Sequence, residues 1–191
     1  MISIFLAQSS PRPRPDLHEF TYLTWNTTFA QSKYCKEKGL ALGLSKNGYE
    51  AQLRYSAQRS GEIFKIFEEV FGGKDRLVRV LATHGAHVWT GTTAMDWNDA
   101  YKGADAIASA PYFDGMYGDA RTANKVSEMS VDELLAKNRV RNAEYAAEAK
   151  IRGLKRMCYE SGQHLTGVGE AENNEKLTKL FHAGWTCISK T

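Results

Sequence analysis

Strand-like and helix-like segments alternate along the middle of this 191-residue chain. Short apolar runs of the length expected for buried strands occur at 76–82, 104–110 and 154–159. Because strands that alternate with helices pack in parallel and are joined by right-handed crossovers, the pattern predicts an α/β fold with helices outside the strands. We expect an arc of a (β/α) barrel, and an open doubly wound sheet is the alternative.

The helix expected at 49–71 has the strongest periodicity in the chain. Its apolar side chains recur at helical spacing, and a glycine pair follows as a stop signal. The next clear helix, at 130–152, begins with Ser130 and Glu133, which form a capping-box pattern. Weaker patterns predict a strand at 18–26, a helix at 28–39, a short helix or turn at 92–100 and a last helical stretch at 173–183.

The chain is short for a complete eight-stranded barrel, which takes about 250 residues. We therefore expect a partial TIM-type barrel of about four parallel strands with outer helices. Its organisation is predicted as an irregular segment at 1–18, the barrel domain at 19–183 and a tail at 184–191. A half-barrel leaves two strand edges unpaired and an apolar inner face exposed, so a homodimer that covers the edges is one expected state.

Charge and motif content argue against several function classes. The net charge is +3 and the basic residues are not clustered, so no nucleic-acid partner is expected. The three cysteines lie far apart without a CxxC pair, and we expect no metal site and no cofactor. No phosphate-binding glycine motif follows a predicted strand. Because no stretch resembles a signal peptide or a membrane span, a cytoplasmic protein without a membrane partner is expected.

Residues suited to binding a sugar follow the predicted strands. The active sites of parallel α/β folds lie at the carboxyl ends of the strands, so we expect these side chains to gather there. Aromatic planes stack on the apolar faces of sugar rings, and carboxyl, imidazole and amide groups bind sugar hydroxyls. The residues at these positions are His84, His87 and Trp89 after 76–82, Tyr112 after 104–110, and Glu160, Gln163 and His164 after 154–159.

Each of these residues also has a plain structural interpretation. Glu160 follows its strand directly and should point into the barrel mouth, but a glutamate there could also pair with an arginine or cap a turn. Tyr112 could orient Glu160 or pack in the core. Trp89 could be a stacking platform or a lid over the barrel end. His84 and His87 could be hydrogen-bonded loop residues, since no third ligand stands at a spacing typical of a metal site.

Five segments of the chain share a recognisable pattern, at 49–60, 62–67, 76–82, 104–113 and 159–164. Together they resemble a family of bacterial proteins, often labelled hypothetical or cellulose-binding, which are similar to the (β/α)8 glycoside hydrolases. The resemblance spans roughly residues 19–182 and is most specific in the middle of that range. It implies a fold in which catalytic glutamates follow strands four and seven of the barrel.

The resemblance also implies roles for individual residues. Glu160 matches the nucleophile after strand seven, and Tyr112 matches a tyrosine after strand six that contacts it. The acid/base glutamate of the family lies in a segment of the form Tyr-Ser-Asn-Glu-Val-Trp-Asn. The corresponding residues 20–26 keep the final Trp-Asn but have Tyr22 and Leu23 in place of Asn-Glu. Retaining glycosidases need two carboxyls about 5–5.5 Å apart, and leucine cannot donate a proton.

We therefore expect a carbohydrate-active, glycoside-hydrolase-like protein with Glu160 in the place of the nucleophile and no acid/base glutamate. Whether it is an enzyme stays open. One alternative is a non-catalytic carbohydrate-binding module that holds sugar through Trp89, Tyr112 and Gln163. The other is a barrel fragment without function. An oligo- or polysaccharide is the expected ligand, and the resemblance leaves room for secreted full-length relatives.

Overall fold

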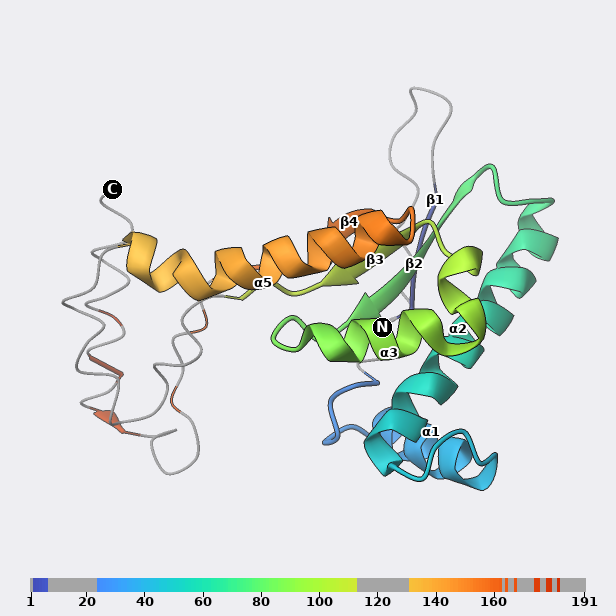
Figure 1. The fold of residues 1–191 in the computed structure, drawn as a ribbon, viewed down its shortest axis with the longest axis horizontal. Helices are drawn as coiled ribbons and strands as arrows, with labels where there is room; N and C mark the ends of the chain where they lie inside the picture. The colour runs from blue at the N-terminus through green and yellow to red at the C-terminus, as the bar shows by residue number, and fades with distance from the viewer. Residues whose placement is uncertain are drawn as a thin grey trace. The chain divides into compact units, whose positions relative to one another are not determined.

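The computed structural model of the chain describes residues 2–6, 24–112, 131–162, 164, 167, 174–175, 178–179 and 182, with the backbone alone at 2–6, 131–135 and 137. By their contacts the residues form two compact units, one of Met1–Ala110 with Glu144–Tyr159 and the other of Pro111–Ala143 with Glu160–Thr191. The elements follow in the order β1 (Ile2–Leu6), α1 (Ala30–Ala41), α2 (Gly48–Phe71), β2 (Leu77–Thr83), α3 (Val88–Asp96), the 3-10 helix η1 (Trp97–Gly103), β3 (Ala106–Ser109), α5 (Val131–Ile151) and β4 (Lys155–Cys158) (Figure 1).

Most of the elements predicted from the sequence are confirmed. Strands β2, β3 and β4 and helices α1, α2 and α5 lie within a few residues of their expected bounds. Helix α3 begins earlier than the short helix or turn expected at 92–100, and η1 continues it. Of the strand expected at 18–26, residues 24–26 lie in or beside a turn, and the rest are outside the described residues. Most of the helical stretch expected at 173–183 is also outside them.

The ends of α2 show why this helix is recognisable from the sequence. The side chain of Asn47 caps it by accepting hydrogen bonds from the backbone N–H groups of Tyr49 (2.9 Å) and Glu50 (3.0 Å). Gly72 ends it in the left-handed region, with φ 71°, and its N–H bonds the last carbonyls. Both signals are local, so they can be read without knowledge of the tertiary structure.

The sheet has the strand order β1-β2-β3-β4. Strands β2, β3 and β4 run parallel, which confirms the α/β prediction, and they form an open sheet among the described residues. Strand β1 pairs with β2 in antiparallel direction, with Leu6 opposite Leu77. The expectation of about four parallel strands is therefore wrong for one strand. The fourth parallel strand was expected at 18–26, whereas the fourth strand of the sheet is β1, which lies in the segment predicted to be irregular. An apolar run of five residues is a weak local signal for a strand, and the direction of the strand depends on the partner with which it pairs.

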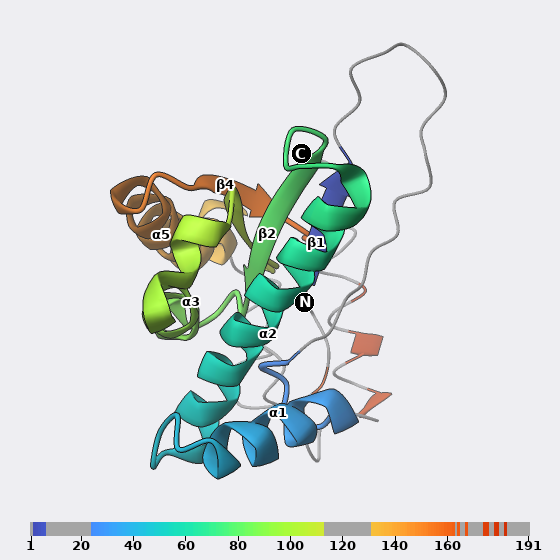
Figure 2. The ribbon, with the colours of Figure 1, turned by 90° about the vertical axis from the view of Figure 1, so that its right-hand side faces the viewer.

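One face of the sheet carries the larger apolar side chains, and helices cover it. Leu77, Leu81 and Ile107 pack with Phe64 of α2 and Met95 of α3, and Figure 2 shows α2 and α3 beside β2. The last part of α5 adds to the same core. The opposite face carries smaller buried side chains, which are Val80, Ala106 and Ala108. Burial of both faces explains why these strands are almost continuously apolar.

An ion-pair cluster joins the beginnings of β2 and β3 to α2. The guanidinium of Arg79 donates to both carboxylate oxygens of Asp105 (2.9 and 2.8 Å) and to Glu68 of α2 (2.7 Å). The backbone N–H of Arg79 also donates to Asp105. These hydrogen bonds raise the pKa of Arg79 and lower that of Asp105. The cluster lies at the amino end of the parallel strands, so it stabilises the sheet at the end where active sites are not found.

Within the second unit, the described part of α5 holds the segment that follows β3. The side-chain amide of Asn138 donates to the backbone carbonyls of Pro111 (2.6 Å) and Tyr112 (2.9 Å). None of the described helices is both long and apolar enough to span a membrane.

Candidate functional site

A groove with a volume of about 310 Å³ lies between the first turns of α2 and the α3–η1 segment of the first unit. Its size is at the small end of ligand-binding pockets, which run from about 300 to 1,000 Å³. Two carboxylates, one guanidinium, two hydroxyls and two indoles line it. These side chains belong to Glu50, Arg54, Trp89, Thr92, Thr93, Asp96 and Trp97.

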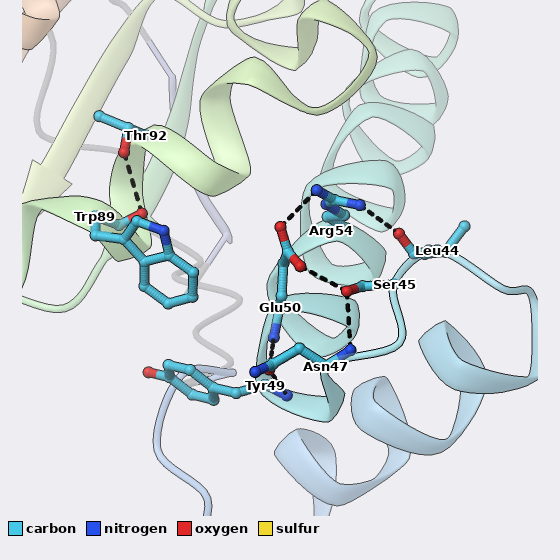
Figure 3. Close-up of polar contacts among 8 residues, drawn as sticks. All are labelled: Leu44, Ser45, Asn47, Tyr49, Glu50, Arg54, Trp89 and Thr92. Carbon is cyan, nitrogen blue, oxygen red and sulfur yellow. Dashed lines mark hydrogen bonds and ion pairs between the residues drawn. The ribbon is translucent and has the colours of Figure 1, made fainter.

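The α2 side of the groove is a fixed network of polar groups (Figure 3). Because Asn47 caps the helix, Glu50 stands in its first turn. One carboxylate oxygen of Glu50 accepts from the hydroxyl of Ser45 and the other from the guanidinium of Arg54, both at 2.5 Å. Arg54 also donates to the backbone carbonyl of Leu44. Glu50 and Arg54 are four residues apart, a spacing that brings opposite charges together on one helical face.

Trp89 stands in the first turn of α3 as a half-exposed indole, with 51% of its surface accessible. Its ring lies beside that of Tyr49 in α2, with the centroids 6.1 Å apart and the planes at 31° (Figure 3). The Tyr49 hydroxyl is fixed by donation to the backbone carbonyl of Trp25 (3.1 Å). An exposed aromatic plane that is held in place is a surface on which a ligand ring can stack.

The loop between β2 and α3 holds Trp89 in this position. Tyr145 of α5 is 1% exposed, and its hydroxyl lies 2.6 Å from the backbone carbonyl of His84 and 2.9 Å from that of His87. Burial raises the pKa of Tyr145, so its hydroxyl remains a donor at neutral pH. Gly85 fits only because it has no side chain, since a Cβ there would lie 2.0 Å from the carbonyl oxygen of Ala110.

The other end of the groove is formed by Asp96 and Trp97. Asp96 accepts two hydrogen bonds from the guanidinium of Arg152, both at 2.7 Å. The guanidinium carbon of Arg54 lies 4.8 Å from the centroid of the Trp97 ring. The indole N–H of Trp97 is buried and has no hydrogen-bond partner among the described residues. A buried donor of this kind costs free energy until an acceptor reaches it.

The residues predicted from the sequence fall into separate groups. In the first unit, the rings of His84 and His87 stack at 5.3 Å in the β2–α3 loop, close along the chain to Trp89. In the second unit, Tyr112 and His164 meet edge to face at 5.2 Å. Glu160 lies two residues beyond Cys158, the last residue of β4. Gln163 lies outside the described residues.

His84 and His87 have no third metal ligand beside them among the described residues. His84 uses its Nδ1 to accept a hydrogen bond from the backbone N–H of Ala86 (3.1 Å). Across the part of the chain that the structure describes, no three His, Cys, Asp or Glu side chains are placed to hold a metal ion.

Sequence reasoning missed most of the groove. Glu50 and Arg54 lie in a helix that precedes β2, whereas the residues predicted for the site all follow the carboxyl ends of strands. Asp96 and Trp97 lie at the end of α3, in a segment predicted only as a helix or turn. The pair of charges four residues apart at the start of α2 was the one local signal that could have drawn attention to this end of the helix.

A second hollow of about 490 Å³ lies between α1 and α2. Its wall includes the rings of Tyr34 and Tyr55, which meet edge to face at 6.1 Å, and the buried thiol of Cys35, whose pKa burial raises. The hydroxyls of Thr24 and Ser56 in its lining already bond each other at 2.6 Å. These two hydroxyls are therefore already engaged with each other.

Comparison with known proteins gives no family for this chain: no family model, no curated protein and no solved structure matches it.

Proposed function

We propose that this chain binds carbohydrate in the groove beside Trp89 and does not hydrolyse it. The observation that carries the proposal is the half-exposed Trp89 indole, held beside Tyr49 at the edge of a groove whose other walls are polar. A sugar ring has apolar C–H faces and a hydroxyl rim, so it needs an aromatic plane and polar side chains together. The groove offers both within a volume suited to a mono- or disaccharide.

The polar groups of the groove include both hydrogen-bond acceptors and hydrogen-bond donors, and a sugar hydroxyl can bind to either kind. Each carboxylate oxygen has two lone pairs. In Glu50 and Asp96 the lone pairs that do not already accept a hydrogen bond can accept one from a sugar hydroxyl. The Trp97 indole N–H is a donor without a partner among the described residues. Thr93 adds a hydroxyl that can donate or accept. Such mixed sets fix the orientation of a polyol ligand.

Binding without hydrolysis follows from the roles of the two carboxylates. A glycosidase needs one carboxyl that donates a proton to the leaving oxygen. Glu50 and Asp96 both accept hydrogen bonds from guanidinium groups, so both carboxyls of the groove already serve as acceptors. We therefore assign them to hydrogen bonds with sugar hydroxyls and assign neither as the acid of a hydrolysis.

The test is a titration with cellobiose and other neutral oligosaccharides, followed by calorimetry and ligand-observed NMR. Loss of a stacked platform that buries about 60–100 Å² removes roughly 1.5–2.5 kcal/mol, so Trp89→Ala should weaken binding about 10–60-fold. Tyr34→Ala is the matched control, because Tyr34 is an aromatic residue of equal exposure (51%) on α1, away from the groove. Wild-type affinity in the Trp89→Ala variant, or no saturable binding by the unmodified chain, would overturn the proposal.

A second candidate is residual glycosidase activity with Glu160 as nucleophile. It is favoured by the position of Glu160 two residues after the end of the parallel strand β4, and by the contact of Tyr112 with His164 in the second unit. Aryl glycosides with activated leaving groups need little acid assistance, so they suit a site with one carboxylate. Hydrolysis that is present in the wild type and lost in Glu160→Ala would establish this candidate. Equal rates in both proteins would exclude Glu160 as the nucleophile.

We also propose that the open sheet is an arc of a (β/α) barrel. It is supported by the order of the parallel strands, which are neighbours in both sequence and space. It is supported further by the division of the sheet into a helix-covered face with Leu81 and Ile107 and an opposite face of small residues with Ala106 and Ala108. In a barrel the helices form the outer ring, so the face that they do not cover lines the interior.

A further inference from the structure

We infer that the groove beside Trp89 is selective for neutral pyranosides and discriminates against sugars that carry a carboxylate, such as uronic acids. The inference rests on the proposed carbohydrate binding and adds the class of sugar. It follows from how the charged groups of the lining are already paired.

The lining has more acidic than basic groups. Glu50 and Asp96 contribute two carboxylates and Arg54 one guanidinium, so the formal charge of the lining is −1. A carboxylate on the ligand would add a like charge a few ångströms from Glu50 and Asp96. A hydroxymethyl group at the same ring position would add none, and it could donate a hydrogen bond to either carboxylate.

The one cation of the lining is not available to the ligand. Arg54 donates to the carboxylate of Glu50 and to the backbone carbonyl of Leu44, and its guanidinium lies against the Trp97 ring. An anionic sugar would have to displace Glu50 to pair with Arg54, which would leave the Glu50 carboxylate without its cation. A second cation, Arg152, pairs with Asp96 of the lining and is held by both Asp96 and Glu148.

Trp97, which also lines the groove, has an uncharged hydrogen-bond donor. The buried N–H of Trp97 has no partner among the described residues, so it gains from any acceptor that reaches it, including a sugar hydroxyl or ring oxygen. This donor carries no charge, so it does not offset the like-charge repulsion that a ligand carboxylate meets from Glu50 and Asp96.

The experiment compares two probes that differ only at one carbon: methyl β-D-glucopyranoside and methyl β-D-glucuronide. At low ionic strength the wild type should bind the glucoside at least tenfold more tightly than the glucuronide. Salt should strengthen binding of the glucuronide and leave the glucoside nearly unchanged, because salt screens the like-charge repulsion. This comparison needs no variant.

Glu50→Gln tests the cause of the selectivity. The substitution keeps the shape of the side chain, removes one negative charge and leaves the Arg54 guanidinium without its ion-pair partner. The preference for the glucoside over the glucuronide should therefore become smaller or reverse. Glu62→Gln is the control, because Glu62 lies on the same helix and pairs with Arg59 away from the groove. Its glucoside-to-glucuronide ratio should equal that of the wild type.

The outcomes separate the two proposals. Glucuronide binding as tight as glucoside binding, or binding that weakens with salt, would overturn the inferred selectivity and leave carbohydrate binding intact. An unchanged ratio in a folded Glu50→Gln variant would overturn the assigned cause of the selectivity. If neither probe nor any oligosaccharide binds, the proposed function itself fails.

Discussion

The hydroxyl of Tyr145 is predicted to hold the loop that carries Trp89. It is the buried hydrogen-bond donor to the backbone carbonyls of His84 and His87, and it lies 3.4 Å from the hydroxyl of Thr83. One proton serves two carbonyls, so its removal affects both ends of the loop. Tyr145→Phe deletes only this oxygen, because the phenyl ring still fills the same space in the core.

The expected cost follows from the burial of the site. Removal of one partner from a buried hydrogen bond costs about 1–3 kcal/mol, and no cavity cost is added because the ring stays. In a protein of this length each kcal/mol shifts the melting temperature by about 2–4 °C. Tyr145→Phe should therefore lower the melting temperature by about 2–12 °C, measured by circular dichroism during heating and by urea unfolding.

Tyr101→Phe provides a matched control for this substitution. Tyr101 packs against the same core, but its hydroxyl has no hydrogen bond among the described residues. Loss of the Tyr101 hydroxyl should change the free energy of unfolding by no more than about 0.5 kcal/mol. The Tyr145→Phe variant should also bind sugar more weakly, since the Trp89 platform is less well fixed. Equal stabilities of the two variants would refute the role assigned to Tyr145.

Three further substitutions test the elements that position the groove. Gly85→Ala places a Cβ 2.0 Å from the carbonyl oxygen of Ala110, so the loop must move; we expect a loss of about 1–3 kcal/mol in unfolding free energy and weaker sugar binding in calorimetry. Asn47→Ala removes the cap of α2 and should cost about 1 kcal/mol in urea unfolding, whereas an unchanged stability would show that the cap is replaced by water. Asp105→Asn tests a pH dependence, because hydrogen bonds from Arg79 lower the pKa of Asp105 below its ordinary 3.8. The ionised Asp105 therefore stabilises the fold fully above pH 3.8, and this stabilisation is lost as the pH falls through the lowered pKa. The stability of the wild type should therefore fall more steeply with acid than that of Asp105→Asn, and parallel acid profiles would contradict this assignment.

The secondary structure was predictable where the signals are local. Helix α2 is marked by a repeat of apolar residues, by Asn47 as its cap and by Gly72 at its end, and all three lie within the helix or next to it. Strands β2, β3 and β4 follow from short apolar runs. Strand β1 lies within residues 1–18, for which the sequence predicts no regular element, and its antiparallel direction depends on its partner β2.

The candidate site was predictable only in part. Trp89 was expected after β2 either as a stacking platform or as a lid over the barrel end, and its half-exposed ring beside the groove is compatible with the first role. Glu160 and Tyr112 remain predictions for the second unit. The polar groups that accompany Trp89 were missed, because Glu50 and Arg54 come from a helix that precedes β2.

The sequence by itself determined the alternation of strands and helices, the parallel α/β class and the place of the Trp89 indole after β2, because each depends on residues that are close along the chain. Only the tertiary structure decided which side chains surround that indole. Packing of α2 beside α3 brings Glu50 within one groove with Trp89 and Trp97, although about forty residues separate them. The charge of a binding groove depends on such distant pairings, so its selectivity cannot be read from any single segment.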